Sequence, residues 1–336
     1  MWLLTPMMRI YYPFFIILMI LGLLIAMSSN SWLITWIGLE INLYTFIPLI
    51  LHSNMQKRKE AAAKYFIAQA TGSALLLAAT LSLSSFPLMS SMLFICSLLL
   101  KGGLAPMHFW FPSTMAISSW FSCFLMTTIQ KLAPVSLLIS MFPMNSQIML
   151  MLGSLMTLIG GLSGMNQTQL RAILAYSSIG QMGWIIVATQ SSFLLSMIMI
   201  INYMITVTAM MMILSYMEWT TNNESNMLWG YKKLTIFLLF ILLINLSGIP
   251  PFPGFFFKAM VIMKLASISA MKTSMLLIMG SILSLYFYLK IMFNSLFSIS
   301  NKKFINEMYL NTTLNIMIIT ISSISIFILF FMIPWI

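Results

Sequence analysis

Four ionisable residues lie inside long apolar stretches of the chain: Glu40, Lys101, Lys131 and Lys258. A charged side chain at the centre of a membrane helix costs about 2.5–3.5 kcal/mol on insertion scales, so each residue is expected to belong to a functional site. Burial without a counter-charge favours neutral lysine, whereas a nearby glutamate favours the ammonium form. A glutamate–lysine pair that forms and breaks can load and release a proton, so the expected chemistry is proton transfer.

Lys101 stands at a predicted break in an apolar helix. The stretch 98–112 reads LLLKGGLAPMHFWFP, in which Gly102, Gly103 and Pro106 follow the lysine. In a helix interior glycine costs about 1 kcal/mol and proline about 3 kcal/mol relative to alanine. A helix break in lipid is tolerated only where protein or water covers the freed backbone groups. The pattern therefore predicts a polar site inside a helix bundle.

The chain repeats this pattern once. Residues 248–254 read GIPPFPG, and Lys258 follows them. Two interrupted hydrophobic segments in corresponding places, each with a lysine, are typical of transporters built from inverted repeats.

His108 lies seven residues after Lys101. If the helix resumed without rotation, the two side chains would share one face. Histidine titrates close to physiological pH, so His108 suits a proton shuttle between lysines.

Each of these residues also has a purely structural explanation, which the sequence leaves open. Lys101 and Lys258 can donate to the carbonyls freed by the breaks. Glu40 can be a static ion-pair partner. Lys131 can snorkel toward the membrane surface if its span is displaced, and His108 can bond to a carbonyl near the break.

The composition indicates an all-α polytopic membrane protein. Of the 336 residues, 61% are hydrophobic and 6% are charged, and the apolar runs are long enough to span a bilayer of about 30 Å. Their continuity argues against a β-barrel. The net charge of +11 comes from basic residues scattered through short loops, so no nucleic-acid partner is expected. The 35 methionines indicate either a mitochondrial genome or a flexible core.

About eleven spans are predicted in one transmembrane domain without linkers, and the fourth and ninth of them are interrupted. They lie at 10–27, 32–51, 61–83, 91–112, 114–141, 147–163, 170–189, 191–217, 234–267, 272–297 and 311–335.

The loop charges predict the orientation of the chain. Basic residues occupy alternate loops, at Arg9, Lys57, Arg58, Lys59, Arg171, Lys232, Lys233, Lys302 and Lys303. The opposite loops, around 84–90, 142–146 and 190, carry no charge, and only Lys272 departs from the pattern. The positive-inside rule then places the N-terminus on the matrix or cytoplasmic side.

The chain lacks sequence signatures of redox centres. It has no glycine-rich nucleotide fingerprint, no cysteine cluster and no haem-like pair of histidines, so we expect no redox centre here.

Four polar residues are expected to link helices by hydrogen bonds: Tyr176, Ser177, Ser178 and Gln181.

An ordered set of motifs carries a family resemblance over roughly residues 30 to 260. Besides the two breaks, the motifs are WIGLEIN (36–42), EAAAKYF (60–66), QKLAP (130–134), GGLSGMNQTQLR (160–171) and AYSSIGQMGW (175–184). The chain resembles the antiporter-like membrane-arm subunits of mitochondrial respiratory complex I, an NADH:ubiquinone oxidoreductase, and among them the subunit 2 family.

The resemblance implies two inverted five-helix repeats, at about 10–141 and 147–297, and a C-terminal helix at about 311–335. It implies that Glu40 and Lys101 form a regulating pair, that Lys131 is a central relay, and that Lys258 is the terminal lysine of the second half-channel. His108 occupies the motif position between the lysines. Gly102 and Gly103 stand where other members often show serine or leucine.

The resemblance also implies a place and partners. The expected location is the mitochondrial inner membrane, in a hetero-oligomer with other membrane-arm subunits and inner-membrane lipids. NADH, FMN, iron–sulfur clusters and ubiquinone would belong to the holoenzyme, with no cofactor in this chain. Two alternatives are a stand-alone cation/proton antiporter and a structural scaffold subunit.

Overall fold

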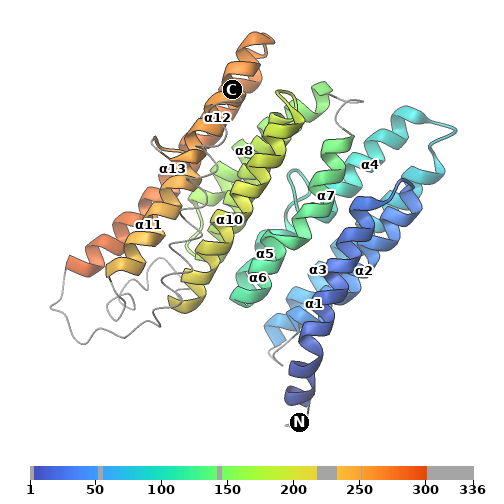
Figure 1. Ribbon diagram of the computed structural model, residues 1–336, viewed down its shortest axis with the longest axis horizontal. Coiled ribbons are helices and arrows are strands. Elements are labelled where there is room, and N and C mark those ends of the chain that lie inside the picture. Colours follow the sequence, from blue (N-terminus) through green and yellow to red (C-terminus); the bar gives the residue numbers. More distant parts are fainter. Residues whose placement is uncertain (1–3, 52–55, 142–145, 218–232, 251, 301–336) are drawn as a thin grey trace. The chain divides into compact units, whose positions relative to one another are not determined.

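The computed structural model describes residues 4–51, 56–141, 146–217, 233–250 and 252–300, and all regular elements of these ranges are α-helices (Figure 1). The chain divides into two compact units, Met1–Met144 and Asn145–Ile336. The first unit holds α1 (Leu4–Ser28), α2 (Trp32–Ile50), α3 (Gln56–Leu81), α4 (Pro87–Gly102), α5 (Trp110–Ile117), α6 (Trp120–Thr127) and α7 (Ile129–Ser140). The second holds α8 (Ser146–Met165), α9 (Leu170–Ala188), α10 (Phe193–Met217), α11 (Lys233–Ser247), α12 (Pro253–Ser267) and α13 (Met271–Ser300).

Seven helical segments of the described residues are long and apolar enough to cross a membrane. They are Tyr11–Ser28, Trp32–Ile50, Trp120–Ser140, Gln147–Met165, Leu170–Ala188, Phe193–Met217 and Met271–Asn294. The chain is thus a multi-pass helical membrane protein, as the composition predicts. The span expected at 311–335 lies outside the described residues.

Helices of the first unit pack in chain order. The first helix lies beside the second, the second contacts the third and the third contacts the fourth, while α7 packs on α1 and α4 (Figure 1). Small residues allow the closest of these approaches, because a Cβ atom on Gly38 would lie 2.7 Å from the Gly22 carbonyl oxygen.

The second unit shows the same sequence of helix contacts. Its first helix, α8, packs on α9, followed by α9 on α10 and α10 on α11, while α13 packs on α8 and α11. Glycines again permit the first contact, since a Cβ atom on Gly183 would lie 2.5 Å from the carbonyl oxygen of Gly153.

The fifth predicted span, 114–141, is found in large part as the segment Trp120–Ser140, but it is not one continuous helix. Its first residues belong to α5, which ends at Ile117, and α6 begins only at Trp120. Ser119 caps α6 by accepting the Ser122 amide at 3.3 Å. Thr128 then separates α6 from α7 with a non-helical backbone, and its hydroxyl donates to the Phe124 carbonyl at 2.7 Å. Side-chain hydroxyls that bond to nearby backbone compete with the helical pattern in this way.

Candidate functional site

The first helix break lies where the sequence predicts it. At the end of α4, Gly103 has φ of 60°, in the left-handed region that favours glycine. The Leu104 amide donates to the Leu99 carbonyl at 2.9 Å and the Gly103 amide donates to Leu100 at 3.1 Å, which together form a Schellman motif. A Cβ atom at Gly103 would lie 2.8 Å from the Cβ of Phe111, so glycine is required on two grounds.

Two side chains from outside α4 donate to carbonyls at its C-terminal end. The indole nitrogen of Trp110 donates to the Leu100 carbonyl at 3.0 Å. The amide of Gln69, from α3, donates to the Lys101 carbonyl at 2.9 Å. The break is therefore covered by protein, as a break in lipid requires. Sequence reasoning missed Gln69, whose only signal is that it is a polar residue in an apolar run.

Lys101 faces Glu40 across the first unit. Its Nζ lies 3.8 Å from Glu40 Oε1, and the side chains are 1% and 13% exposed. The distance fits an ion pair but exceeds a hydrogen bond, and neither atom has a hydrogen-bond partner among the described residues. Lys101 does not close the break, because its Nζ donates to no carbonyl among the described residues. The predicted Glu40–Lys101 pair is thus present in the geometry.

Lys131 is buried in α7 with an exposed fraction of 1%. Snorkelling is therefore excluded. Its Nζ lies 4.1 Å from the ring centroid of Phe111, which comes from α5. A cation above an aromatic face is attracted by the ring quadrupole. Because Phe111 also packs against Gly103, the break after Lys101 sets the position of the ring that contacts Lys131.

His108 lies in the non-helical stretch between α4 and α5. The helix does not resume before Trp110, so the condition for a face shared with Lys101 is not met. The His108 ring nitrogen Nδ1 lies 3.1 Å from the Pro106 carbonyl, and the ring stacks on Phe109 with a centroid separation of 4.6 Å. This geometry matches the alternative in which His108 bonds to a carbonyl near the break.

The second break, between α11 and α12, is also where the sequence predicts it. The first of these helices ends at Ser247, Gly248 has φ of 78°, and the next helix begins at Pro253. The Asn245 side-chain oxygen accepts the amide of Gly254 at 2.9 Å. One side chain therefore ties the end of α11 to the first turn of α12.

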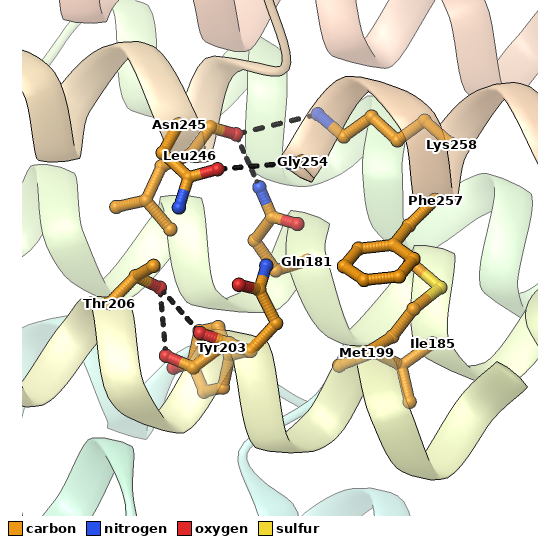
Figure 2. Close-up of a pocket in the computed structure, with 11 residues that line it drawn as sticks. Gln181, Ile185, Met199, Tyr203, Thr206, Asn245, Leu246, Gly254, Phe257 and Lys258 are labelled. Carbon is orange, nitrogen blue, oxygen red and sulfur yellow. Dashed lines mark hydrogen bonds between the residues drawn. The ribbon is translucent and has the colours of Figure 1, made fainter. Parts of the chain in front are cut away.

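Lys258 folds back from α12 onto the end of α11. Its Nζ donates to the carbonyl oxygen of Ser247 at 3.0 Å. It also donates to the carbonyl oxygen of Leu246 at 3.4 Å (Figure 2). Gln181 from α9 donates to the same Leu246 carbonyl at 2.7 Å, an interhelical bond of the kind predicted for it. Lys258 Nζ also lies 5.6 Å from the Trp184 ring centroid. The lysine is 7% exposed, and the structural role left open for it is present in the geometry.

A small polar cavity adjoins Lys258. Its volume is about 20 Å³. Its lining consists of Gln181, Ile185, Met199, Asn202, Tyr203, Thr206, Asn245, Leu246, Gly254, Phe257 and Lys258 (Figure 2). A cavity needs roughly 10–15 Å³ of this kind of volume to hold one water molecule, so this one has room for a water. Lys258 and Gln181 also line a second cavity of about 10 Å³.

The predicted site residues thus divide between the two units. The first unit brings Glu40 and Lys101 together, and there Lys131 contacts the ring of Phe111, which follows the same helix break. In the second unit, Lys258 lies at the helix break. Among the described residues, no group of three or more His, Cys, Asp or Glu side chains forms a metal site.

Comparison with known proteins gives consistent matches. A family model described as NADH:quinone oxidoreductase/Mrp antiporter, transmembrane, matches residues 29–87 and 83–284. NADH-ubiquinone oxidoreductase chain 2 of Lumbricus terrestris is 40% identical over 288 residues, which cover 83% of this chain and 84% of that protein. The protein of the same name from Tetraodon nigroviridis is 38% identical over 284 residues, 81% of each chain.

A solved structure shares the fold. One chain of respiratory complex I from Thermus thermophilus with bound aureothin superposes with a TM-score of 0.82 at 20% identity. The match covers 94% of this chain and 76% of that chain.

Proposed function

The chain belongs to the NADH:quinone oxidoreductase/Mrp antiporter family of transmembrane proteins, and from this premise we propose that it carries a proton-translocation pathway in a membrane arm. The predicted identity as an NADH-ubiquinone oxidoreductase subunit is confirmed by relatives that bear this name over most of the chain. The observation that carries the pathway is a lysine buried beside the broken helix of each unit, since an ionisable group inside a membrane span marks an ion or proton route.

In this proposal the four charged residues act in order. Glu40 Oε1 and Lys101 Nζ form a pair with a separation of 3.8 Å, and neither atom makes a hydrogen bond within the part of the chain that the structure describes. The pair can therefore open without breaking a hydrogen bond in that part. Lys131 is the central relay against the ring of Phe111, and Lys258 is the terminal lysine. His108 remains a candidate relay, although its bond to Pro106 also fits a structural role.

We propose that the units correspond to two inverted repeats. The boundary between them lies at residues 144 and 145, each contains one broken helix with a lysine, and helices contact one another in the same order in both. Five spans in the first repeat would start the second on the opposite face of the membrane, which inverts it. With one further span at 311–335, the total would be eleven, and the charged loops favour an N-terminus on the matrix side.

The proposed setting is the mitochondrial inner membrane, among other membrane-arm subunits and lipids. Moving one proton against 100 mV costs about 2.3 kcal/mol, and this energy would come from oxidation of NADH and reduction of ubiquinone in other subunits. FMN and iron–sulfur clusters would belong to those subunits. The proposed role of this chain is to hold and pass protons at its lysines.

The proposal is tested by replacing Lys258 in the purified holoenzyme, reconstituted in proteoliposomes. Lys258→Met is expected to lower NADH-driven proton pumping more than it lowers assembly of the complex. Lys264→Met is the matched control, because Lys264 lies on the same helix with an exposed side chain. An assembled Lys258→Met complex with an unchanged proton-to-electron ratio would overturn the proposal.

Two rival functions predict different results. A scaffold subunit would lose assembly and pumping together in the Lys258→Met variant. A stand-alone antiporter, which the Mrp part of the family description favours, would transport protons on an imposed cation gradient without NADH.

A further inference from the structure

The cavity beside Lys258 contains a buried acceptor that the relay described above does not use. Asn202, on α10, lines this cavity and is 9% exposed. Its side-chain oxygen Oδ1 is buried and has no hydrogen-bond partner among the described residues. Burying an acceptor without a partner costs about 1–3 kcal/mol, so a partner inside the cavity would be stabilising.

Lys258 supplies the complementary donor. A lysine ammonium carries three N–H donors, and the described contacts of Lys258 use two of them, at Ser247 and Leu246. Lys258 and Asn202 line the same cavity from α12 and α10, two helices that pack on each other. A volume of about 20 Å³ fits one water and excludes a larger ligand.

Other polar groups of the lining complete the surroundings that a water requires. The Thr206 hydroxyl donates at 3.0 Å to the carbonyls of both Asn202 and Tyr203, which leaves its oxygen able to accept. The Tyr203 hydroxyl is hydrogen-bonded with Ser178 of α9. Buried waters make two to four hydrogen bonds, and this cavity offers a donor and several acceptors.

We propose that this cavity binds one water molecule that bridges the Asn202 amide oxygen and the Lys258 ammonium, and that Asn202 is a positioning residue for proton exchange at Lys258. The inference rests on the proposed function, which it deepens. In the exchange, Lys258 gives one N–H proton to the water while the water releases one of its own protons to the Thr206 hydroxyl oxygen, which lines the same cavity. A neutral amine and an unchanged water remain, and Asn202 gains and loses no proton.

The test combines a map of the holoenzyme with proton pumping in proteoliposomes. Asn202→Leu has a similar size and lacks the acceptor, whereas Asn202→Ser keeps a hydroxyl oxygen. Thr208→Val is the matched control on α10, because the Thr208 hydroxyl bonds only to the Ile205 carbonyl of its own helix in the described contacts and lies outside the cavity lining.

The expected result is a water density within hydrogen-bond distance of Asn202 and Lys258 in the unaltered complex, and its loss in Asn202→Leu. Pumping should fall about threefold in Asn202→Leu, the size of one lost hydrogen bond of about 0.7 kcal/mol. The serine variant should retain most of the pumping, and Thr208→Val should pump normally.

Two results would overturn the inference: no water density in the unaltered complex, or normal pumping by an assembled Asn202→Leu variant. If that variant does not assemble, the density map of the unaltered complex still shows whether the water is present. If Lys258→Met stops pumping while Asn202→Leu does not, only the water site fails. If both variants pump normally, both the water site and the proposed function fail.

Discussion

The three buried lysines have three different electrostatic partners. Lys101 faces a carboxylate, Lys131 faces an aromatic ring, and Lys258 donates to carbonyls at the end of a helix. These contacts act through charge–charge attraction, a ring quadrupole and the negative end of a helix dipole. Lysines that differ in this way can hold a proton with unequal strength, which the proposed relay requires.

The Glu40–Lys101 pair leads to a prediction about coupling. Glu40→Gln and Lys101→Met should each lower pumping, and the double variant should pump no worse than Lys101→Met alone, because either change already removes the pair. The coupling energy from the four pumping rates should be about 1–2 kcal/mol, within the range for contacting residues.

The control for this cycle is Lys64→Met. Lys64 belongs to the same unit, but its side chain is 43% exposed and pairs with Glu60 at 2.5 Å. Exposed pairs contribute about 0–1 kcal/mol, so pumping should not change. Additive losses of pumping in the double variant would contradict the prediction that Glu40 and Lys101 act as a pair.

At each break in a helix, a glycine and several side chains together shape the backbone and bond to its carbonyls. Each break has a glycine with positive φ, and side chains from other helices or from the far side of the break cover its carbonyls. At the first break Gly103 also makes room for Phe111, which in turn contacts Lys131. The break is therefore part of the site.

A pair of glycine substitutions tests the break as an element. Gly103→Ala should destabilise the chain by about 1–2 kcal/mol for the left-handed backbone alone, and further because the new Cβ would lie 2.8 Å from Phe111. Gly180→Ala is the control, because a Cβ at Gly180 meets no atom within 4 Å and alanine gains about 1 kcal/mol over glycine in a helix.

The measurement is the temperature at which each purified complex loses this chain. Gly103→Ala should lower that temperature, and Gly180→Ala should leave it unchanged or raise it. A Gly103→Ala complex as stable as the unaltered one would refute this account of the break.

At the scale of the molecule, the apolar surface is consistent with neighbours in a membrane. Only 22% of the Tyr11–Ser28 segment is buried within the structure, and apolar side chains such as Phe14, Ile17 and Leu24 are more than half exposed. Such a face contacts either lipid chains or other membrane helices. The relatives named as chains of an oxidoreductase favour a multi-subunit assembly.

The assembly is tested by a native gel of mildly solubilised inner membranes, stained for NADH oxidation and probed for this chain. The chain should migrate with a large NADH-oxidising band, because the proposed pathway needs the redox subunits. Migration as a small species without that activity would contradict the subunit assignment and favour the free antiporter.

The sequence by itself determined the class of the protein, the two helix breaks and the family. These features depend on local composition, since the costs of a charge, a glycine or a proline inside an apolar helix act at the residue concerned. The family expected from the motifs at Glu40, Lys101 and Lys258 is confirmed by the family model and the relatives. The roles of these residues remain predictions.

Apart from the Glu40–Lys101 pair, which the family resemblance implies, only the tertiary structure decided what the buried lysines face. Gln69 reaches the Lys101 carbonyl across 32 residues of chain, and Gln181 reaches Leu246 across 65. The position of Phe111 over Lys131 likewise follows from the packing of separate helices. Local periodicity contains no information on such pairings, because helix packing brings the partners together from distant parts of the chain.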